Sequence, residues 1–337
     1  MPGAFYLKTA TYLSEEETRM FRKFIAAAVA LAGFAGLFGE KAADAGELRI
    51  GYQKYGTLVI LKEKGLLEEK LKPLGYTVTW TEFPGGPQLL EALNVGAIDF
   101  GTTGEAPPIF AQAAGAPLLY VGYEPPAPTG EAILVPKDSP IKSVADLKGK
   151  KVALNKGSNV HYFLVKALQA GGVDYKDIQP TFLAPADARA AFESGAVDAW
   201  AIWDPFFAAG QAATGARTLV DGTGSDGKGL VSNHQFFLAE QKFTAANPQV
   251  IDTTLAALNE IDNWAAKHPD EVAQDLSPKT GIPVDVLKVA IGRLGFGLRP
   301  IDDSVIAEQQ KIADTFLQLG LIPKPINVAD VVRKPGA

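Results

Sequence analysis

The chain has 337 residues, of which 47% are apolar and 21% are charged, with a formal net charge of −6 and no cysteine. This length is enough for two domains, and this composition is that of an ordinary globular protein. The acidic balance argues against a nucleic-acid partner, and the lack of cysteine excludes disulfides, thiolate metal sites and cysteine nucleophiles.

The first predicted element is a secretory signal peptide. Basic residues lie between Arg19 and Lys23, residues 24–38 are uncharged and apolar, and Ala43-Asp44-Ala45 is a small-x-small cleavage site. The alternative is a core or membrane helix, but 15 residues fall short of the roughly 20 that span a bilayer. We expect residues 1–45 to be a signal peptide with an upstream extension, Met20 being the candidate start.

From residue 48 onward, short apolar strands alternate with amphipathic helices, and the last part of the chain is largely helical. This order predicts mostly parallel, wound sheets. Strands are predicted at 48–52, 76–83, 97–101, 118–123, 132–135, 151–154, 178–183, 196–200 and 233–239. Helices are predicted at 57–71, 88–95, 107–114, 160–170, 188–193, 248–267, 269–276, 283–294 and 302–319.

One helix–turn–strand unit occurs twice, at residues 91–100 and 191–200. Each copy has helical spacing that stops at a glycine (Gly96, Gly195), followed by an aspartate (Asp99, Asp198) and an apolar strand. Glycine after the last helical turn takes the left-handed conformation that ends a helix. Internal similarity at domain spacing indicates two similar lobes that face each other across a cleft.

Two segments are expected to connect these lobes. Residues 124–130 contain three prolines in four positions, and residues 222–233 begin as a glycine-rich loop. The chain would therefore cross between the lobes twice. The predicted first lobe comprises residues 46–126 and 233–337, and the predicted second lobe comprises residues 127–232.

A ligand would lie at the carboxyl ends of the strands, which is where wound sheets bind their ligands. Two loops there, 101–105 and 155–159, lead into helices and carry Thr103 and Ser158. A helix N-terminus offers free N–H groups and a positive dipole end, so it can hold an anion without a cationic side chain. Both hydroxyl residues can equally be ordinary helix caps.

Other candidate residues also have two interpretations. His161 can reach the same opening or serve only in packing, and Trp203 can form the wall of a ligand site or belong to the core. Asp204 can accept or orient a donor. The three histidines are scattered and form no cluster, so no metal site is expected.

The chain resembles the aliphatic sulfonate-binding proteins, which are periplasmic solute receptors of ABC importers in the nitrate, sulfonate and taurine group. The resemblance rests on residues 51–54, 83–104, 185–192 and 197–205, the last of which read Val-Asp-Ala-Trp-Ala-Ile-Trp-Asp-Pro. It implies an α/β fold of type II-like periplasmic binding proteins, with two lobes, each a wound sheet flanked by helices, and a two-strand hinge. It also implies a monomer without cofactor that delivers its ligand to a membrane permease and its ATPase. The residues it places around the sulfonate are Gln53, Thr103, Gly104, Ser158, Asn159, His161, Trp203 and Asp204.

Two alternatives stay open. Taurine receptors of this group carry an acidic residue in the first loop, whereas residues 53–57 here are Gln-Lys-Tyr-Gly-Thr, which favours unsubstituted alkanesulfonates. Taurine, nitrate or another small anion is the first alternative. The second is an enzyme on the same scaffold, such as a desulfinase, but that route uses a cysteine, and we predict a receptor without catalytic activity.

Overall fold

The computed structural model describes residues 46–54, 56–225 and 229–334, which belong to one compact unit, Gly46–Ala337. The predicted signal peptide lies outside these residues. No helix in the described part is long and apolar enough to cross a membrane.

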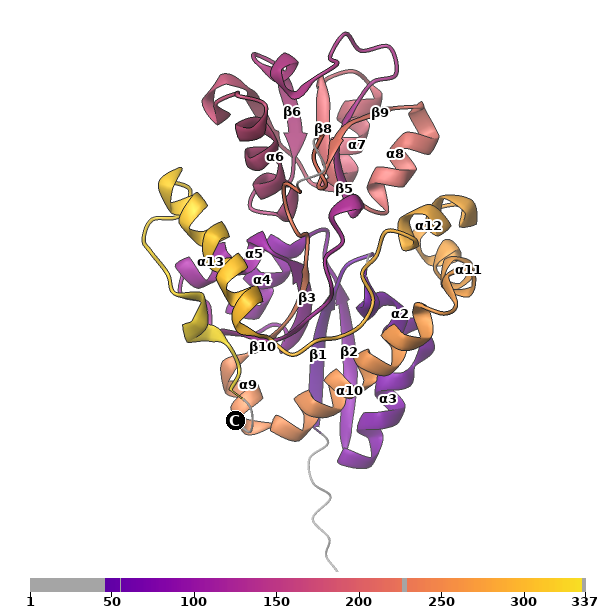
Figure 1. The fold of residues 1–337 in the computed structure, drawn as a ribbon. Coiled ribbons are helices and arrows are strands. Elements are labelled where there is room, and N and C mark those ends of the chain that lie inside the picture. Colours follow the sequence, from indigo (N-terminus) through magenta and orange to yellow (C-terminus); the bar gives the residue numbers. More distant parts are fainter. Residues whose placement is uncertain (1–45, 55, 226–228, 335–337) are drawn as a thin grey trace, which may run out of the picture. The chain divides into compact units, whose positions relative to one another are not determined.

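Two five-stranded sheets organise this unit (Figure 1). Sheet 1 has the order β2 (Tyr76–Glu82), β1 (Gly46–Tyr52), β3 (Phe100–Gly104), β10 (Gln235–Glu240) and β4 (Leu118–Tyr123). Sheet 2 has the order β7 (Gln179–Phe182), β6 (Lys151–Leu154), β8 (Ala199–Trp203), β5 (Glu131–Val135) and β9 (Arg217–Asp221). We call each sheet with its flanking helices the first and the second lobe.

The two sheets have the same topology. In each, one strand (β10 or β5) runs antiparallel to both of its neighbours, and the other pairings are parallel. Both antiparallel strands are the ones that follow a crossing between the lobes, so the chain enters each sheet in reverse. The predicted wound sheets are thus mixed, with a single reversed strand in each.

Every predicted helix is present with changed ends, and two further helices, at Phe206–Thr214 and Gln241–Ala246, were not predicted. The helix bounds are α2 Thr57–Lys64, α3 Leu66–Leu71, α4 Gly86–Asn94, α5 Ala106–Ala113, α6 Asn159–Ala170, α7 Pro185–Glu193, α8 Phe206–Thr214, α9 Gln241–Ala246, α10 Pro248–Ala265, α11 Pro269–Thr280, α12 Val284–Ile291 and α13 Asp303–Gln318. Short 3₁₀ turns lie at Lys72–Leu74, Pro128–Gly130, Val144–Leu147, Tyr175–Asp177 and Val328–Val331. The single helix predicted at 57–71 is two helices, because Gly65 adopts φ 65° and ends α2.

The repeated unit has the same local structure in both lobes. Gly96 (φ 70°) follows α4 and Gly195 (φ 72°) follows α7. The carboxylate of Asp99 accepts the main-chain N–H of Arg49 at 2.9 Å, and that of Asp198 accepts the N–H of Lys151 at 2.8 Å. Each aspartate therefore joins its turn to the neighbouring strand, β1 or β6. The predicted recurrence of the helix-ending glycine and of the following aspartate is confirmed, and both aspartates have a structural role.

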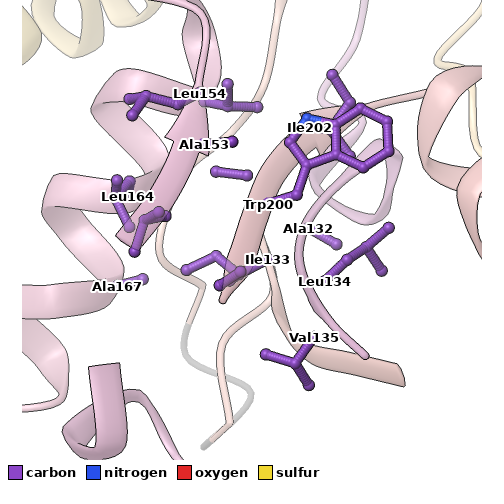
Figure 2. Packing of buried hydrophobic residues seen from close by; sticks show 14 of the residues in the cluster. Ala132, Ile133, Leu134, Val135, Ala153, Leu154, Leu164, Ala167, Trp200 and Ile202 are labelled. Carbon is purple, nitrogen blue, oxygen red and sulfur yellow. The ribbon is translucent and has the colours of Figure 1, made fainter. Parts of the chain in front are cut away.

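Apolar residues fill both lobes. In the second lobe, side chains from β5, β6, β8 and α6 form one core around Trp200, Leu154 and Leu164 (Figure 2). Sheet 1 is covered on both faces, since one cluster packs against α10 and another against α5 and α13.

The two crossings lie side by side. The N–H of Ala127 donates to the carbonyl of Ser232 at 3.0 Å, and the N–H of Gly222 donates to the carbonyl of Pro128 at 3.0 Å. The N–H of Glu124 donates to the carbonyl of Gln235 at 2.8 Å. Main-chain hydrogen bonds thus join the crossings into a paired connection, as expected of a two-strand hinge. The division of the chain at residues 126/127 and 232/233 stays a prediction.

Candidate functional site

A small cavity of about 20 Å³ lies where the two lobes meet. A cavity of this volume has room for about one water molecule, whereas small-molecule sites typically enclose about 300–1,000 Å³, so a ligand needs the lobes to move apart. Residues of both lobes and of the second crossing line it: Gln53, Gly86, Gly104, Pro107, Ser158, Asn159, Trp203, Asn233 and Gln235. Among the described residues, those that line this cavity include no charged side chain, so it presents only uncharged polar groups and apolar surface.

The strands bring their carboxyl ends to this cavity. Gln53 follows β1, Gly104 is the last residue of β3 and Trp203 is the last residue of β8. This position is the one that strand direction predicts for a ligand in a wound sheet. The expected location of the site, between the lobes and at the strand ends, matches the cavity.

Three helices also begin at the cavity. Gly86 is the first residue of α4, Pro107 lies in the first turn of α5, and Ser158 occupies the N-cap position of α6. Their positive dipole ends converge on the cavity from both lobes, which favours a negatively charged guest. Two of these helix starts were predicted to face the ligand, whereas the helix at α4 was predicted without such a role.

Five of the eight predicted ligand residues line the cavity, and most of their polar groups already have protein partners. The Gln53 amide donates from Nε2 to the carbonyl of Thr102 at 3.1 Å. The hydroxyl of Ser158 donates to the carbonyl of Asn155 at 2.7 Å. Trp203 is buried and presents apolar surface. Gly104 supplies main chain only, and the contacts of Asn159 are described below.

Thr103 and His161 do not line the cavity. The hydroxyl of Thr103 donates to the carbonyl of Gly104. His161 Nδ1 accepts the N–H of Gly157 at 3.2 Å, so Nε2 carries the proton and faces the Tyr175 hydroxyl at 2.9 Å. Burial, assisted by the charge of Lys156, lowers the pKa of His161 to about 4. This histidine is a neutral packing group in the structure, and its predicted ligand role stays a prediction.

Asp204 also does not line the cavity. Its Oδ2 lies 3.1 Å from Nη1 of Arg293, a residue that follows α12 of the first lobe. Its Oδ1 accepts the N–H of Ala208 at 3.0 Å. Burial raises the pKa of Asp204 to about 6, and the arginine opposes that shift. The Arg293 guanidinium also lies over the ring of Phe207, 4.1 Å from its centroid. Asp204 therefore ties the two lobes together through an ion pair.

Two further buried acids lie near the crossings. Glu105, just before α5, accepts the main-chain N–H of His234 at 3.0 Å, and burial raises its pKa to about 8. Glu131, the first residue of β5, is 1% exposed, and neither of its carboxylate oxygens has a hydrogen-bond partner in the described part of the chain. Burial and the nearby Glu105 raise the pKa of Glu131 well above its usual range. Both carboxyls are therefore held as neutral acids close to neutral pH.

Sequence reasoning missed four lining residues, namely Gly86, Pro107, Asn233 and Gln235. Gln235 belongs to the reversed strand β10, where it pairs with Gly104, and its buried Oε1 has no partner among the described residues. The signal for Gly86 was present, since a glycine-rich turn before a helix is also an anion-binding pattern. Nothing in the local sequence marks Asn233 or Gln235, because only the return of the chain brings them to the site.

The two mixed α/β sheets, the paired crossings and the cavity between the lobes define the class of periplasmic binding proteins. The model of the NMT1/THI5-like family matches residues 74–272. An aliphatic sulfonates-binding protein of Escherichia coli (strain K12) is 46% identical over 289 residues, which are 86% of this chain and 89% of that protein.

Similar solved structures belong to the same family of sulfonate-binding proteins. The alkanesulfonate-binding protein SsuA from Xanthomonas axonopodis pv. citri, bound to MOPS, has a TM-score of 0.80 at 42% identity, covering 86% of this chain and 99% of that one. The periplasmic aliphatic sulphonate-binding protein SsuA from Escherichia coli has a TM-score of 0.76 at 45% identity, covering 86% and 92%. The chain belongs to the family of aliphatic sulfonate-binding proteins, within the NMT1/THI5-like group.

Proposed function

We propose that this chain is a periplasmic receptor that captures aliphatic sulfonates and delivers them to an ABC permease and its ATPase. The observation that supports this most directly is the cavity between the lobes, which has no charged lining residue and faces the positive ends of three helices. Such a site suits an anion whose charge is spread over several oxygens. The names of the matched relatives point to the same ligand class.

The proposed ligand contacts come from both lobes. Gln53 and Gly104 on one side and Ser158 on the other would share the sulfonyl head, and Trp203 would lie against the alkyl tail. A hydrogen bond to a charged acceptor contributes about 1.5–3 kcal/mol. Several such bonds could supply the roughly 8 kcal/mol that micromolar affinity requires. Thr103, His161 and Asp204 are proposed to act only through the walls of the site.

The proposed motion is hinge closure. The two predicted lobes, 46–126 with 233–337 and 127–232, would rotate about the paired crossings, and a ligand that touches both lobes favours the closed form. Export through the predicted signal peptide, function as a monomer and delivery to the permease belong to the same proposal.

Calorimetry tests this proposal on the mature chain, titrated with ethanesulfonate, taurine, nitrate and sulfate. We expect ethanesulfonate to bind most tightly and the inorganic anions weakly, because only an alkanesulfonate uses both the polar and the apolar lining. Absence of heat from every alkanesulfonate at millimolar concentration would refute the assignment. Stronger binding of taurine than of ethanesulfonate would instead indicate a taurine receptor.

A further inference from the structure

The amide of Asn159 joins the two lobes to each other. Asn159 is the first residue of α6 in the second lobe, and α6 lies next to α5 of the first lobe (Figure 1). Its Oδ1 accepts the N–H of Ala106 at 3.3 Å, and its Nδ2 donates to Oδ1 of Asn233 at 2.7 Å. Both ends of this amide therefore bind protein groups.

Asn233 extends this connection to the crossings. Its own Nδ2 donates to the carbonyl of Ala127 at 2.8 Å, so the main chain fixes the direction of every bond in the series. Asn233 is 2% exposed and has φ 53°, a left-handed conformation that asparagine adopts more readily than most residues. The series runs from Ala106 through Asn159 and Asn233 to Ala127. It thus includes the first lobe, the second lobe and both crossings.

Gly104 provides the space for this amide. A Cβ at Gly104 would lie 2.0–2.2 Å from the Nδ2, Cγ and Oδ1 atoms of Asn159. The φ of Gly104 does not lie in the left-handed region, so the requirement for glycine here is steric rather than conformational. The side chain of one lobe fills the hollow that the other lobe leaves at the end of β3.

We propose that Asn159 is a positioning residue that holds the lobes closed, rather than a donor to the ligand's head group. This inference rests on the proposed receptor function and assigns Asn159 and Gly104 a role in the closure equilibrium. The interlobe hydrogen bonds favour the closed, binding-competent form. When a smaller fraction of the protein is in that form, the apparent affinity for the ligand decreases. Gln53, Ser158 and the main chain of Gly104 remain the proposed partners of the sulfonate.

The test compares Asn159→Ala, Gly104→Ala and the double variant by calorimetry with ethanesulfonate. Loss of two hydrogen bonds in Asn159→Ala should weaken binding by about tenfold to thirtyfold. Gly104→Ala should weaken it more, because its methyl group overlaps the amide and holds the lobes apart. The double variant should bind about as well as Asn159→Ala, since the three atoms that the methyl group overlaps are then absent.

Closure is measured separately by the distance between two labels. The chain has no cysteine, so cysteines introduced at Val95 and Ser194 carry the labels alone. Both positions are exposed and lie at equivalent helix ends in the two lobes. Without ligand, Asn159→Ala should lengthen the distance, whereas Asn155→Ala, the matched control, truncates a neighbouring asparagine outside the interlobe series and should lengthen it less.

Three results overturn the inference: a double variant that binds more weakly than either single variant, weaker binding of Asn159→Ala with unchanged label distances, or unchanged binding and distances in Asn159→Ala. Should Gly104→Ala fail to fold, the label distances of Asn159→Ala decide alone. If the wild-type protein binds no alkanesulfonate, the proposed function has failed, while the distances without ligand still test the closure role of Asn159.

Discussion

Glu105 should make the protein less stable as the pH rises, and Glu105→Gln should remove this effect. Its carboxyl is 3% exposed, receives main-chain N–H groups of the second crossing and lies near Glu131 and Glu308. Its position just before α5 favours a negative charge by up to about 2 kcal/mol. Burial of an ionised carboxylate disfavours that charge by several kcal/mol, so burial prevails and the neutral acid is the stable form.

The size of this loss of stability follows from the pKa of Glu105, which rises from 4.5 to about 8 on folding. The folded protein then holds a proton that the unfolded chain releases, so the stabilisation is complete below pH 4.5 and is lost as the pH rises to 8. At about 1.36 kcal/mol per pH unit, the loss amounts to about 5 kcal/mol in total. Between pH 5.5 and 8.5, about 3 kcal/mol of it is lost. Glutamine carries no charge and can still accept the His234 N–H through its carbonyl oxygen.

The assay is urea unfolding of the wild-type protein and of Glu105→Gln at pH 5.5 and 8.5. The free energy of unfolding of the variant, relative to the wild type, should increase by about 3 kcal/mol between the two values of pH. Glu69→Gln makes the same change at an exposed glutamate of α3 and shows what the substitution itself does. A relative stability that is equal at both values of pH would refute the reasoning.

Three further predictions follow from buried contacts and from the repeat. Arg293→Met should lower the free energy of unfolding by about 2–3 kcal/mol, because Asp204 is then buried without its cation. Adding Asp204→Asn should restore most of this free energy. Additive effects of the two substitutions in urea unfolding would contradict this prediction. The wild-type protein should lose stability below pH 6.5, because the unfolded histidine takes up a proton there while folded His161, with a pKa of about 4, does not. His161→Phe should reduce this loss. Parallel melting-temperature profiles of the variant and the wild type from pH 7 to 4.5 would disprove the prediction. Gly96→Ala and Gly195→Ala should each lower stability by about 1–2 kcal/mol, since both glycines have φ near 70°, and unequal costs would show that the two turns are not equivalent.

The fold could be predicted from the sequence because its signals are local. Gly96 and Asp99, repeated as Gly195 and Asp198, gave the two similar lobes, and the prolines at 124–130 gave the first crossing. The reversed strands were not evident, because strand direction depends on which neighbours a strand finds. The split at Gly65 was missed, although a glycine stands within the helix predicted at 57–71.

The site could be predicted only where its residues follow strands directly. Gln53, Gly104 and Trp203 line the cavity for that reason. Asp204 immediately follows β8, yet its side chain turns to Arg293, which lies 89 positions away in the sequence. No local sequence pattern around Asp204 predicts Arg293 as its partner. The same holds for Asn233, whose side chain bonds to Asn159 and to Ala127 in two distant segments.

The repeat also explains how two similar lobes build one asymmetric site. Counting five residues from each aspartate leads from Asp99 to Gly104 and from Asp198 to Trp203, and both of these strand-end residues line the cavity. One lobe therefore contributes the smallest residue at this position and the other contributes the largest. The amide of Asn159 occupies the space beside Gly104, and Trp203 lines the cavity with apolar surface, where we propose that it contacts the alkyl tail of the ligand.

The next pair of equivalent positions in the repeat consists of Glu105 and Asp204. Both are buried acids, but their carboxylates have different partners. Asp204 has Arg293 as its partner, and its pKa is about 6. Glu105 receives main-chain N–H groups alone, and its pKa is about 8. Part of this difference is the lower ordinary pKa of aspartate, 3.8 against 4.5 for glutamate; in addition, Arg293 lowers the pKa of Asp204, whereas Glu308 raises that of Glu105. Gln309 donates from Nε2 to the main-chain carbonyl of Glu105 at 2.9 Å, so Gln309→Arg should introduce a cation near Glu105, lower its pKa and reduce the pH dependence of stability. An unchanged pH dependence in a folded Gln309→Arg protein would show that the missing cation does not contribute to the difference between the two acids.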